Sequence, residues 1–363
     1  MGAIFLAEEV PIREESNKKA MVVAFRTLMR DYWAVRAPPL SSPSRPSLMP
    51  GGFLQSMYTV LHETGDDWHR RGQQSDAAEA IQHILEYLHD GMYSPVEMAI
   101  GGDPVTTPAE ISQRKALESW IAFHKKEYSP IVETFNGLMK TVVTCSTCGT
   151  ESERFEPNLM LKPPIPGARA AGGPPPTLIE CMEDGFAPEE IPDYHCLRCE
   201  KKGMAIKRER IARLPPVQLV AIKRFINLGP QGTIQRKVRG RIPWNLDAFD
   251  FSPWCAFSRN PFTGHKESKV YRTEAIIEHH GSMGGGHYLM YNRTSEGWVQ
   301  CDDSSVMAVP AESVITEDSY IAVMVPVDTR ERDTRRFAAT VEALRLVRDP
   351  PPPTDSPFRS RPA

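Results

Sequence analysis

Long apolar runs and a strong net charge are both missing from this sequence of 363 residues. No stretch approaches the roughly 20 apolar residues that a membrane-spanning helix requires. The first apolar run, at residues 3–7, is stopped by Glu8 and Glu9 and is too short for a secretory signal. The formal charge of −3 gives no electrostatic reason to bind nucleic acid or an anionic membrane. We therefore expect neither of these partners, and we expect the protein in the cytoplasm or the nucleus.

Cysteine is also scarce, and the first of the seven cysteines is Cys145. In a long chain without a secretory signal, such cysteines indicate metal binding or catalysis rather than disulfides. Four of the seven form two Cys-x-x-Cys pairs, and each pair can direct two thiolates at one tetrahedral ion. The alternatives are four unrelated buried cysteines, a redox pair, or His195 replacing one ligand. We predict a structural zinc site whose ligands are Cys145, Cys148, Cys196 and Cys199.

The order of the helical and strand-like segments predicts an α+β fold. Apolar side chains recur at helical spacing over residues 21–32 and 77–88, and a third helical stretch covers residues 110–126. Asp76 can cap the second of these helices. Strand-like segments dominate after residue 137. Helices followed by strands are typical of α+β proteins.

A histidine and a carboxylate lie one hairpin apart near the end of the strand-rich region. His287 follows three glycines and opens an alternating strand segment, and Asp302 lies on the next one. A histidine oriented by a carboxylate is two-thirds of a nucleophile–His–carboxylate site, although a lone histidine is often only structural. Asp302 and Asp303 should point to opposite faces of a strand, so only one can face His287 squarely. The side chain of Cys301 should point away from the Asp302 face, which argues against this thiol as the nucleophile.

Eight short motifs follow one another along the chain. They are Gln74-x-Asp76-Ala77-x-Glu79, Phe135-x-Gly137, Cys145-x-x-Cys148, Tyr194-x-Cys196-x-x-Cys199, Leu214-Pro215-Pro216 with Lys223-Arg224-Phe225, Ala275-Ile-Ile-x-His279-x-Gly281, Gly286-His287-Tyr288, and Trp298 to Asp303. Each motif is weak alone, but eight in this order are specific. Over residues 1–326 the chain resembles the ubiquitin-specific protease family of deubiquitinases.

The resemblance implies a papain-like cysteine protease that cleaves after the C-terminal Gly-Gly of ubiquitin. It implies His287 as the general base and Asp302 as its orienting carboxylate, with Asp303 assisting. Ubiquitin and ubiquitinated proteins are the expected partners, and a monomer is the expected state. The expected subdomains are a helical thumb at about residues 1–135, zinc-carrying fingers at 136–205 and a palm at 206–326, followed by an Arg/Pro-rich disordered tail at 327–363. The residues that match positions contacting the ubiquitin tail are Asp76, Glu79, His279, Gly281, Gly285, Gly286 and Tyr288.

The chain departs from the family pattern in two places. Ala78 and Ala80 stand where the family usually has larger side chains. The segment that carries the family's nucleophilic cysteine is not present, and residues 1–13 resemble what directly follows it. We therefore expect the nucleophile just ahead of Met1, and the chain as printed to be inactive. Three interpretations remain open, namely an active deubiquitinase with a truncated sequence, a catalytically inactive ubiquitin-binding scaffold, and a zinc-ribbon interaction protein unrelated to ubiquitin.

Overall fold

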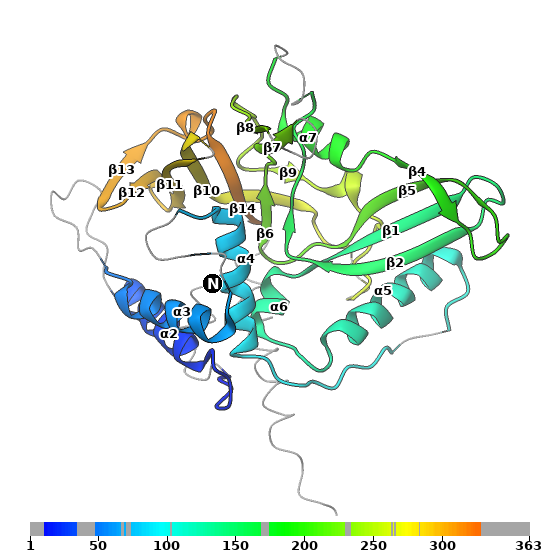
Figure 1. Ribbon diagram of the computed structural model, residues 1–363, viewed down its shortest axis with the longest axis horizontal. Helices are drawn as coiled ribbons and strands as arrows, with labels where there is room; N and C mark the ends of the chain where they lie inside the picture. Colours follow the sequence, from blue (N-terminus) through cyan, green and yellow to red (C-terminus); the bar gives the residue numbers. More distant parts are fainter. Residues whose placement is uncertain are drawn as a thin grey trace, which may run out of the picture.

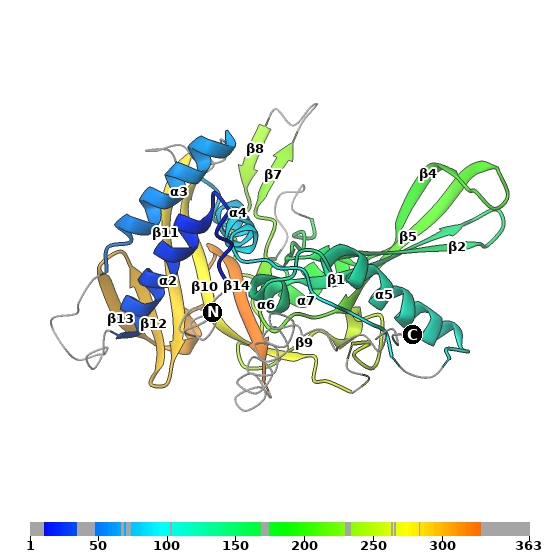
Figure 2. The same ribbon diagram turned by 90° about the horizontal axis from the view of Figure 1, so that it is seen from below.

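The computed structural model describes residues 11–34, 48–66, 69, 74–101, 104–167, 174–228, 234–262, 264, 266–282 and 284–327. A helical region, an elongated four-stranded sheet and a larger eight-stranded sheet make up the fold (Figure 1 and Figure 2). This confirms the predicted α+β class. Most of the segment expected to follow the nucleophile (residues 1–10 of 1–13) and of the expected tail (residues 328–363 of 327–363) lies outside the described residues. None of the described helices is long and apolar enough to cross a membrane.

The helices come first in the chain, and their starts are encoded by local caps. The side chain of Asp76 accepts hydrogen bonds from the backbone N–H groups of Ala78 and Glu79, as its position predicts. Thr107 forms a capping box with Glu110, so the third predicted helix begins at Pro108 rather than at residue 110. The helices are α2 (Lys19–Ala34), α3 (Gly51–Thr64), α4 (Ala77–Asp90), α5 (Pro108–His124), α6 (Pro130–Phe135) and, later in the chain, α7 (Leu178–Gly185).

The four-stranded sheet is antiparallel throughout, and Figure 2 shows it extending away from the rest of the molecule. Its two central strands pair from Leu138–Arg213 at one end to Cys145–Ala205 at the other. Both Cys-x-x-Cys pairs therefore lie at the far end of this sheet. Helix α5 packs along β2, where Ser112 and Lys115 contact Glu153. The strand order is β2 (Glu151–Asn158), β1 (Gly137–Cys145), β5 (Lys202–Arg213) and β4 (Glu189–His195).

The eight-stranded sheet carries the predicted histidine and carboxylate on neighbouring strands. The turn between these two strands is closed by the pair Thr294–Gly297, which confirms the hairpin expected there. The strand order is β13 (Ser305–Val309), β12 (Gly297–Asp302), β11 (Gly285–Thr294), β10 (Val270–Ser282), β14 (Ser319–Pro326), β6 (Gln218–Ala221) and β3 (Met160–Leu161), with β9 (Phe249–Asp250) beside β10. A separate hairpin joins β7 (Phe225–Leu228) to β8 (Ile234–Lys237), and two 3-10 turns cover Ser252–Trp254 and Ala311–Ser313.

One apolar cluster holds α2, α3, α4 and α6 against the larger sheet. Met21 of α2 and Leu88 of α4 are fully buried, and they share this cluster with Phe135 of α6 and Ile321 of β14. In Figure 1, α4 stands beside β6 and β14. The packing brings the start of α4 to the end of β11 that carries the histidine, although more than 200 residues separate the two in sequence.

Candidate active site and metal centre

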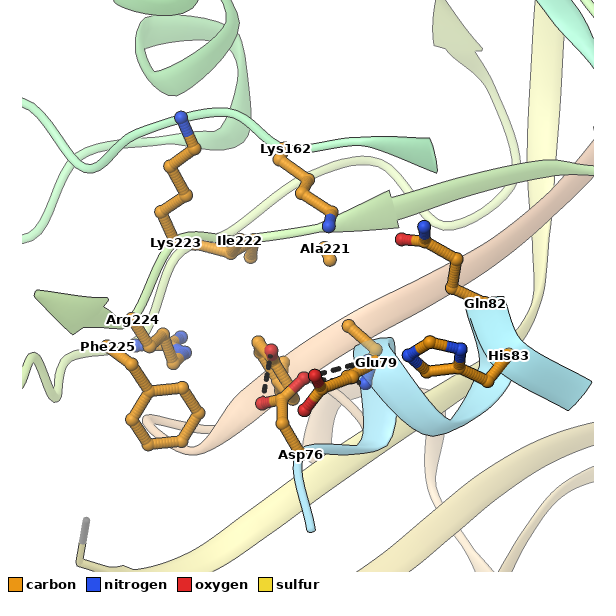
Figure 3. Close-up of a pocket in the computed structure, with 12 residues that line it drawn as sticks. Asp76, Glu79, Gln82, His83, Lys162, Ala221, Ile222, Lys223, Arg224 and Phe225 are labelled. Carbon is orange, nitrogen blue, oxygen red and sulfur yellow. Dashed lines mark hydrogen bonds between the residues drawn. The ribbon is translucent and has the colours of Figure 1, made fainter. Parts of the chain in front are cut away.

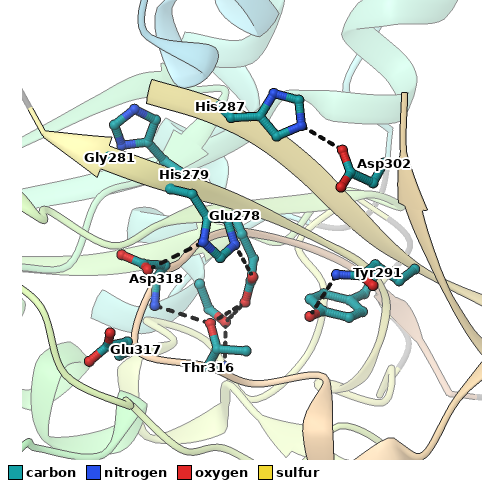
Figure 4. A network of polar contacts seen from close by, with 12 residues as sticks. Glu278, His279, Gly281, His287, Tyr291, Asp302, Thr316, Glu317 and Asp318 are labelled. Carbon is teal, nitrogen blue, oxygen red and sulfur yellow. Dashed lines mark hydrogen bonds and ion pairs between the residues drawn. The ribbon is translucent and has the colours of Figure 1, made fainter. Parts of the chain in front are cut away.

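His287 and Asp302 form a direct hydrogen bond across the β11–β12 hairpin. His287 Nε2 lies 2.5 Å from Asp302 Oδ1 (Figure 4). The hydrogen bond to Asp302, together with the nearby charges of Asp302 and Asp303, raises the pKa of His287 above its usual range. Both side chains are nearly half exposed, so solvent and an incoming group can reach the ring. The bonded Nε2 leaves Nδ1 as the ring nitrogen that can exchange a proton with a reacting group.

Asp303 joins this pair from the turn that follows β12. Its backbone φ is 49°, in the left-handed region, which turns the chain sharply toward β13. One carboxylate oxygen of Asp303 lies in the same group as the reactive atoms of His287 and Asp302, all within 4.8 Å of one another. The structure thus brings together the three residues that the sequence singled out.

Cys301 lies on the other face of the hairpin. The β11–β12 register pairs Met290 with Cys301, and residues paired across an antiparallel ladder share a face. His287 is three residues before Met290, so its side chain points to the opposite face, the one that Asp302 shares. This placement agrees with the expectation that Cys301 is not the nucleophile.

Gly286 and Gly281, near His287, must be glycines because other atoms of the chain lie too close to leave room for a Cβ atom. A Cβ atom at Gly286 would lie 2.4 Å from His279 Nε2 and 2.2 Å from the carbonyl oxygen of His280. At Gly281 the backbone φ is +131°, and a Cβ atom there would lie 2.5 Å from the carbonyl oxygen of Gly285. The side chain of His279 is buried, and its ring lies 4.7 Å from that of Tyr288. The backbone next to His287 is therefore packed so closely that a larger residue at Gly281 or Gly286 would displace it.

A pocket of about 380 Å³ lies between α4 and the end of β6 (Figure 3). Asp76 and Glu79 are on one side of it and Lys162 is on the other. One oxygen of Asp76 caps α4, and the other accepts a hydrogen bond of 2.7 Å from the hydroxyl of Tyr320. Burial, followed by this contact with the Asp76 carboxylate, raises the pKa of Tyr320. Glu79 is exposed and so is the freer of the two predicted carboxylates.

A buried polar network beneath the site was not found by sequence reasoning (Figure 4). Glu278 is completely buried and accepts hydrogen bonds from Ser319 and Thr316. Lys237, also buried, forms an ion pair of 2.6 Å with Asp318 and donates to the carbonyl oxygen of His279. The available signal was the charged Glu278 directly after the apolar run Ala275-Ile276-Ile277, which predicts a satisfied buried charge.

The four predicted cysteine ligands converge at the end of the four-stranded sheet. Their sulfur atoms all lie within 4.8 Å of one another, with Cys145–Cys199 at 4.0 Å and Cys148–Cys196 at 3.7 Å. Zinc bound tetrahedrally at about 2.3 Å from each sulfur requires sulfur–sulfur distances of about 3.8 Å. All four are free cysteines. The donor set and its spacing therefore fit a tetrahedral metal ion with no position left for water.

The two cysteine pairs have the same backbone geometry. The N–H of Gly149 donates to the carbonyl oxygen of Cys145 at 2.9 Å, and the N–H of Glu200 donates to that of Cys196 at 2.8 Å. Gly149 and Glu200 both have positive φ, at 71° and 56°. Both turns therefore close in the same way after the second cysteine. Two equivalent knuckles facing each other form a four-cysteine cluster that could hold a metal ion.

The comparisons with known proteins identify one family. A family model described as "Ubiquitin carboxyl-terminal hydrolase" matches residues 4–323. Human ubiquitin carboxyl-terminal hydrolase 3 is 29% identical over 265 residues, which cover 70% of this chain and 49% of the relative. Human ubiquitin carboxyl-terminal hydrolase 21 is 30% identical over 268 residues, which cover 68% of this chain and 45% of the relative. The chain thus spans about half the length of the curated relatives it matches.

Solved structures share the fold. A yeast SAGA DUB module chain matches 87% of this chain and 60% of its own, with a TM-score of 0.60 and 21% sequence identity. The SAGA Ubp8/Sgf11/Sus1/Sgf73 DUB module bound to ubiquitin aldehyde also covers 87% of this chain, with a TM-score of 0.59 and 21% identity. Because the family model covers nearly all of the described residues, this chain belongs to the ubiquitin carboxyl-terminal hydrolase family.

Proposed function

We propose that this chain is a ubiquitin-binding deubiquitinase domain whose His287 and Asp302 are the base and the orienting carboxylate of a cysteine protease. The hydrogen bond between these two side chains, beside glycines that admit no Cβ atom, carries the proposal. The substrate would be the bond that follows the C-terminal Gly-Gly of ubiquitin. A glycine pair, which has no side chains, would approach the strand beside Gly286 with the least steric conflict.

In the proposed reaction a thiol is the nucleophile and His287 transfers the protons. A thiolate attacks the carbonyl carbon of the last glycine of ubiquitin, and the protonated His287 gives its proton to the departing amine. Water then attacks the resulting thioester, with neutral His287 accepting the water proton, and the thiol is released. Asp302 orients the ring and stabilises the protonated imidazole in both steps, and Asp303 adds negative charge nearby.

The proposed binding path runs from the pocket along α4 to the glycines. Asp76 and Glu79 would contact the extended tail of ubiquitin, and Tyr288 and Gly286 would border its last two residues. Gly281, Gly285 and His279 would shape the channel from below. In this arrangement the helices form a thumb, the four-stranded sheet forms fingers and the eight-stranded sheet forms a palm. The finger cysteines would hold zinc as a structural ion, and we propose a monomer in the cytoplasm or the nucleus.

We also propose that none of the seven cysteines in this sequence is the nucleophile. Four of them form the cluster that would hold the structural ion. Cys181 is fully buried, and burial raises its pKa to about 12. Burial likewise raises the pKa of Cys255 to about 11. Cys301 lies on the face opposite His287. A nucleophilic thiol needs a low pKa and access to the base, and no cysteine here combines the two.

A ubiquitin with a thiol-reactive group at its C-terminus tests this proposal. We expect the chain as printed to bind unmodified ubiquitin by calorimetry but to form no covalent adduct. A version extended at its amino terminus by a cysteine-bearing family segment should gain the adduct. Adduct formation by the printed chain that disappears on Cys301→Ser or Cys255→Ser would overturn the assignment of the cysteines. Absence of ubiquitin binding would overturn the function itself.

The second candidate is a scaffold that binds ubiquitin without cleaving it. The observation that favours it is again that no cysteine of this sequence combines a low pKa with access to His287. It predicts ubiquitin binding in both the printed and the extended versions and adduct formation in neither. The two candidates therefore differ only in the outcome for the extended version.

A further inference from the structure

The side-chain amide of Gln74 forms two hydrogen bonds with the backbone of Gly286, one through its nitrogen and one through its oxygen. Gln74 Nε2 donates to the carbonyl oxygen of Gly286 at 2.6 Å, and the N–H of Gly286 donates to Gln74 Oε1 at 2.6 Å. A side-chain amide has one donor face and one acceptor face, so it can pair with a backbone residue as a neighbouring strand would. Gln74 precedes α4, and Gly286 directly precedes His287, so the pair joins the helical region to the candidate catalytic strand.

The position of Gly286 explains why it can accept such a partner. Along one edge β11 pairs with β10, where Gly286 lies opposite Gly281. Along the other edge its ladder with β12 extends only from Met290 to Thr294. Within the described residues, the edge of β11 at Gly286 is therefore beyond the end of β12. The amide of Gln74 fills the place that a further strand residue would occupy.

The surrounding contacts leave little freedom for this segment. A Cβ atom at Gly285 would lie 3.1 Å from Gln74 Oε1, and one at Gly286 would meet His279 Nε2 at 2.4 Å. The backbone N–H of Ala77 donates to the hydroxyl of Tyr288 at 3.3 Å. Gly286 is therefore held between β10 beneath it and Gln74 beside it. Because Gly286 directly precedes His287, the position of its backbone determines the direction of the His287 side chain.

We propose that Gln74 is a positioning residue that fixes the backbone of Gly286 and thereby aims the His287 ring at Asp302. Its role depends on the proposed function only in that His287 is taken as the base. Gln74 acts through Gly286 and does not touch the reacting atoms. Without it, Gly286 would keep its β10 neighbour and lose both partners on its free edge. The His287 ring would then spend less time hydrogen-bonded to the Asp302 carboxylate.

Substitution of Gln74 by methionine, of similar length but without hydrogen-bonding groups, tests the proposal. The amide hydrogen of Gly286 should exchange at least about tenfold faster, as expected for the loss of one hydrogen bond and of the order it imposes. The pKa of His287, followed by NMR, should move down toward its usual range. The Gln74→Glu variant keeps the acceptor and loses the donor, so its Gly286 exchange should lie between those of the wild type and Gln74→Met. Neither readout requires ubiquitin, so a failure here is distinct from a failure of ubiquitin binding.

Two controls separate positioning from general docking of the helices. Tyr320→Phe removes the hydrogen bond to Asp76, another contact between the start of α4 and the sheet. It should lower the melting temperature and leave Gly286 exchange and His287 titration as in the wild type. Gln55→Ala, at an exposed position of α3, should change neither. The proposal is overturned if Gln74→Met leaves both readouts unchanged, or if Tyr320→Phe shifts them as far as Gln74→Met does.

Discussion

At the scale of the residue, the candidate site depends on one short contact between partly exposed groups. His287 and Asp302 are 15 positions apart, and the hairpin brings them to 2.5 Å. Sequence reasoning could find them because a strand–turn–strand pattern constrains which residues face each other. It could not find the contribution of Gln74, which lies 212 positions from Gly286 and meets it only after the helices pack on the sheet.

Replacement of Asp302 by asparagine should lower the pKa of His287. The hydrogen bond to Asp302 is the largest cause of the raised pKa, and asparagine removes the negative charge that favours the imidazolium. A histidine with a raised pKa contributes stability below the pKa of the unfolded chain, about 6.5, and loses that contribution as the pH rises through its folded value. NMR titration of the ring measures the shift. Asp303→Asn, the matched control, should cause a smaller decrease, and an equal decrease would contradict the assignment of Asp302 as the direct partner.

At the scale of the element, sequence patterns predicted best those features whose interacting residues are close together in the sequence. Asp76 was predicted as a helix cap and is one, because a cap satisfies backbone groups within three residues. Each Cys-x-x-Cys pair is likewise local. The convergence of the two pairs, whose sulfur contacts span 48 and 54 positions, was instead predicted from the need for four thiolates around one ion. By contrast, Glu278 and Lys237 are buried with partners about 40 and 80 positions away, so no local pattern pairs them. The start of α5 was two residues off because Thr107 provides a cap that periodicity alone does not show.

Substitution of Cys199 by serine should release the metal ion and unfold the end of the four-stranded sheet. Removal of one thiolate opens the tetrahedral site, and such sites contribute much of the folding free energy of the segment that carries them. Metal analysis of purified protein should find about one zinc per chain in the wild type and little in the variant, while proteolysis should cut near residues 145–148 and 196–199. The matched control is Cys181→Ser, which lies outside the cluster and should retain zinc. A wild-type protein free of zinc would contradict the prediction.

At the scale of the whole molecule, α2, α3, α4 and α6 pack with the larger sheet around a shared apolar cluster. Met21, Leu88 and Ile321 have no measurable exposure and come from α2, α4 and β14. The site depends on this cluster because the chain that leads into α4 carries Gln74 and the N-cap Asp76, and the sheet carries His287. Loosening the cluster should therefore affect binding as well as stability.

The Leu88→Ala variant should lower the free energy of unfolding by about 2–5 kcal/mol, the range for truncation of a fully buried leucine. Leu54→Ala, at a position of α3 that is 38% exposed, should change it by about 0.5 kcal/mol or less. Urea denaturation of both variants and the wild type measures the difference. Equal effects of the two substitutions would show that the helices do not share a core with the sheet.

Because both oxygens of the Asp76 carboxylate are hydrogen-bonded, mutations at this position should affect folding as well as any ligand contact. One oxygen is engaged by the first turn of α4 and the other by Tyr320. An alanine at this position would thus unsettle the helix and its attachment to β14 together with any ligand contact. A loss-of-function allele at Asp76 would report mainly on folding, and the exposed Glu79, three residues further on, is the position at which an allele would report on recognition.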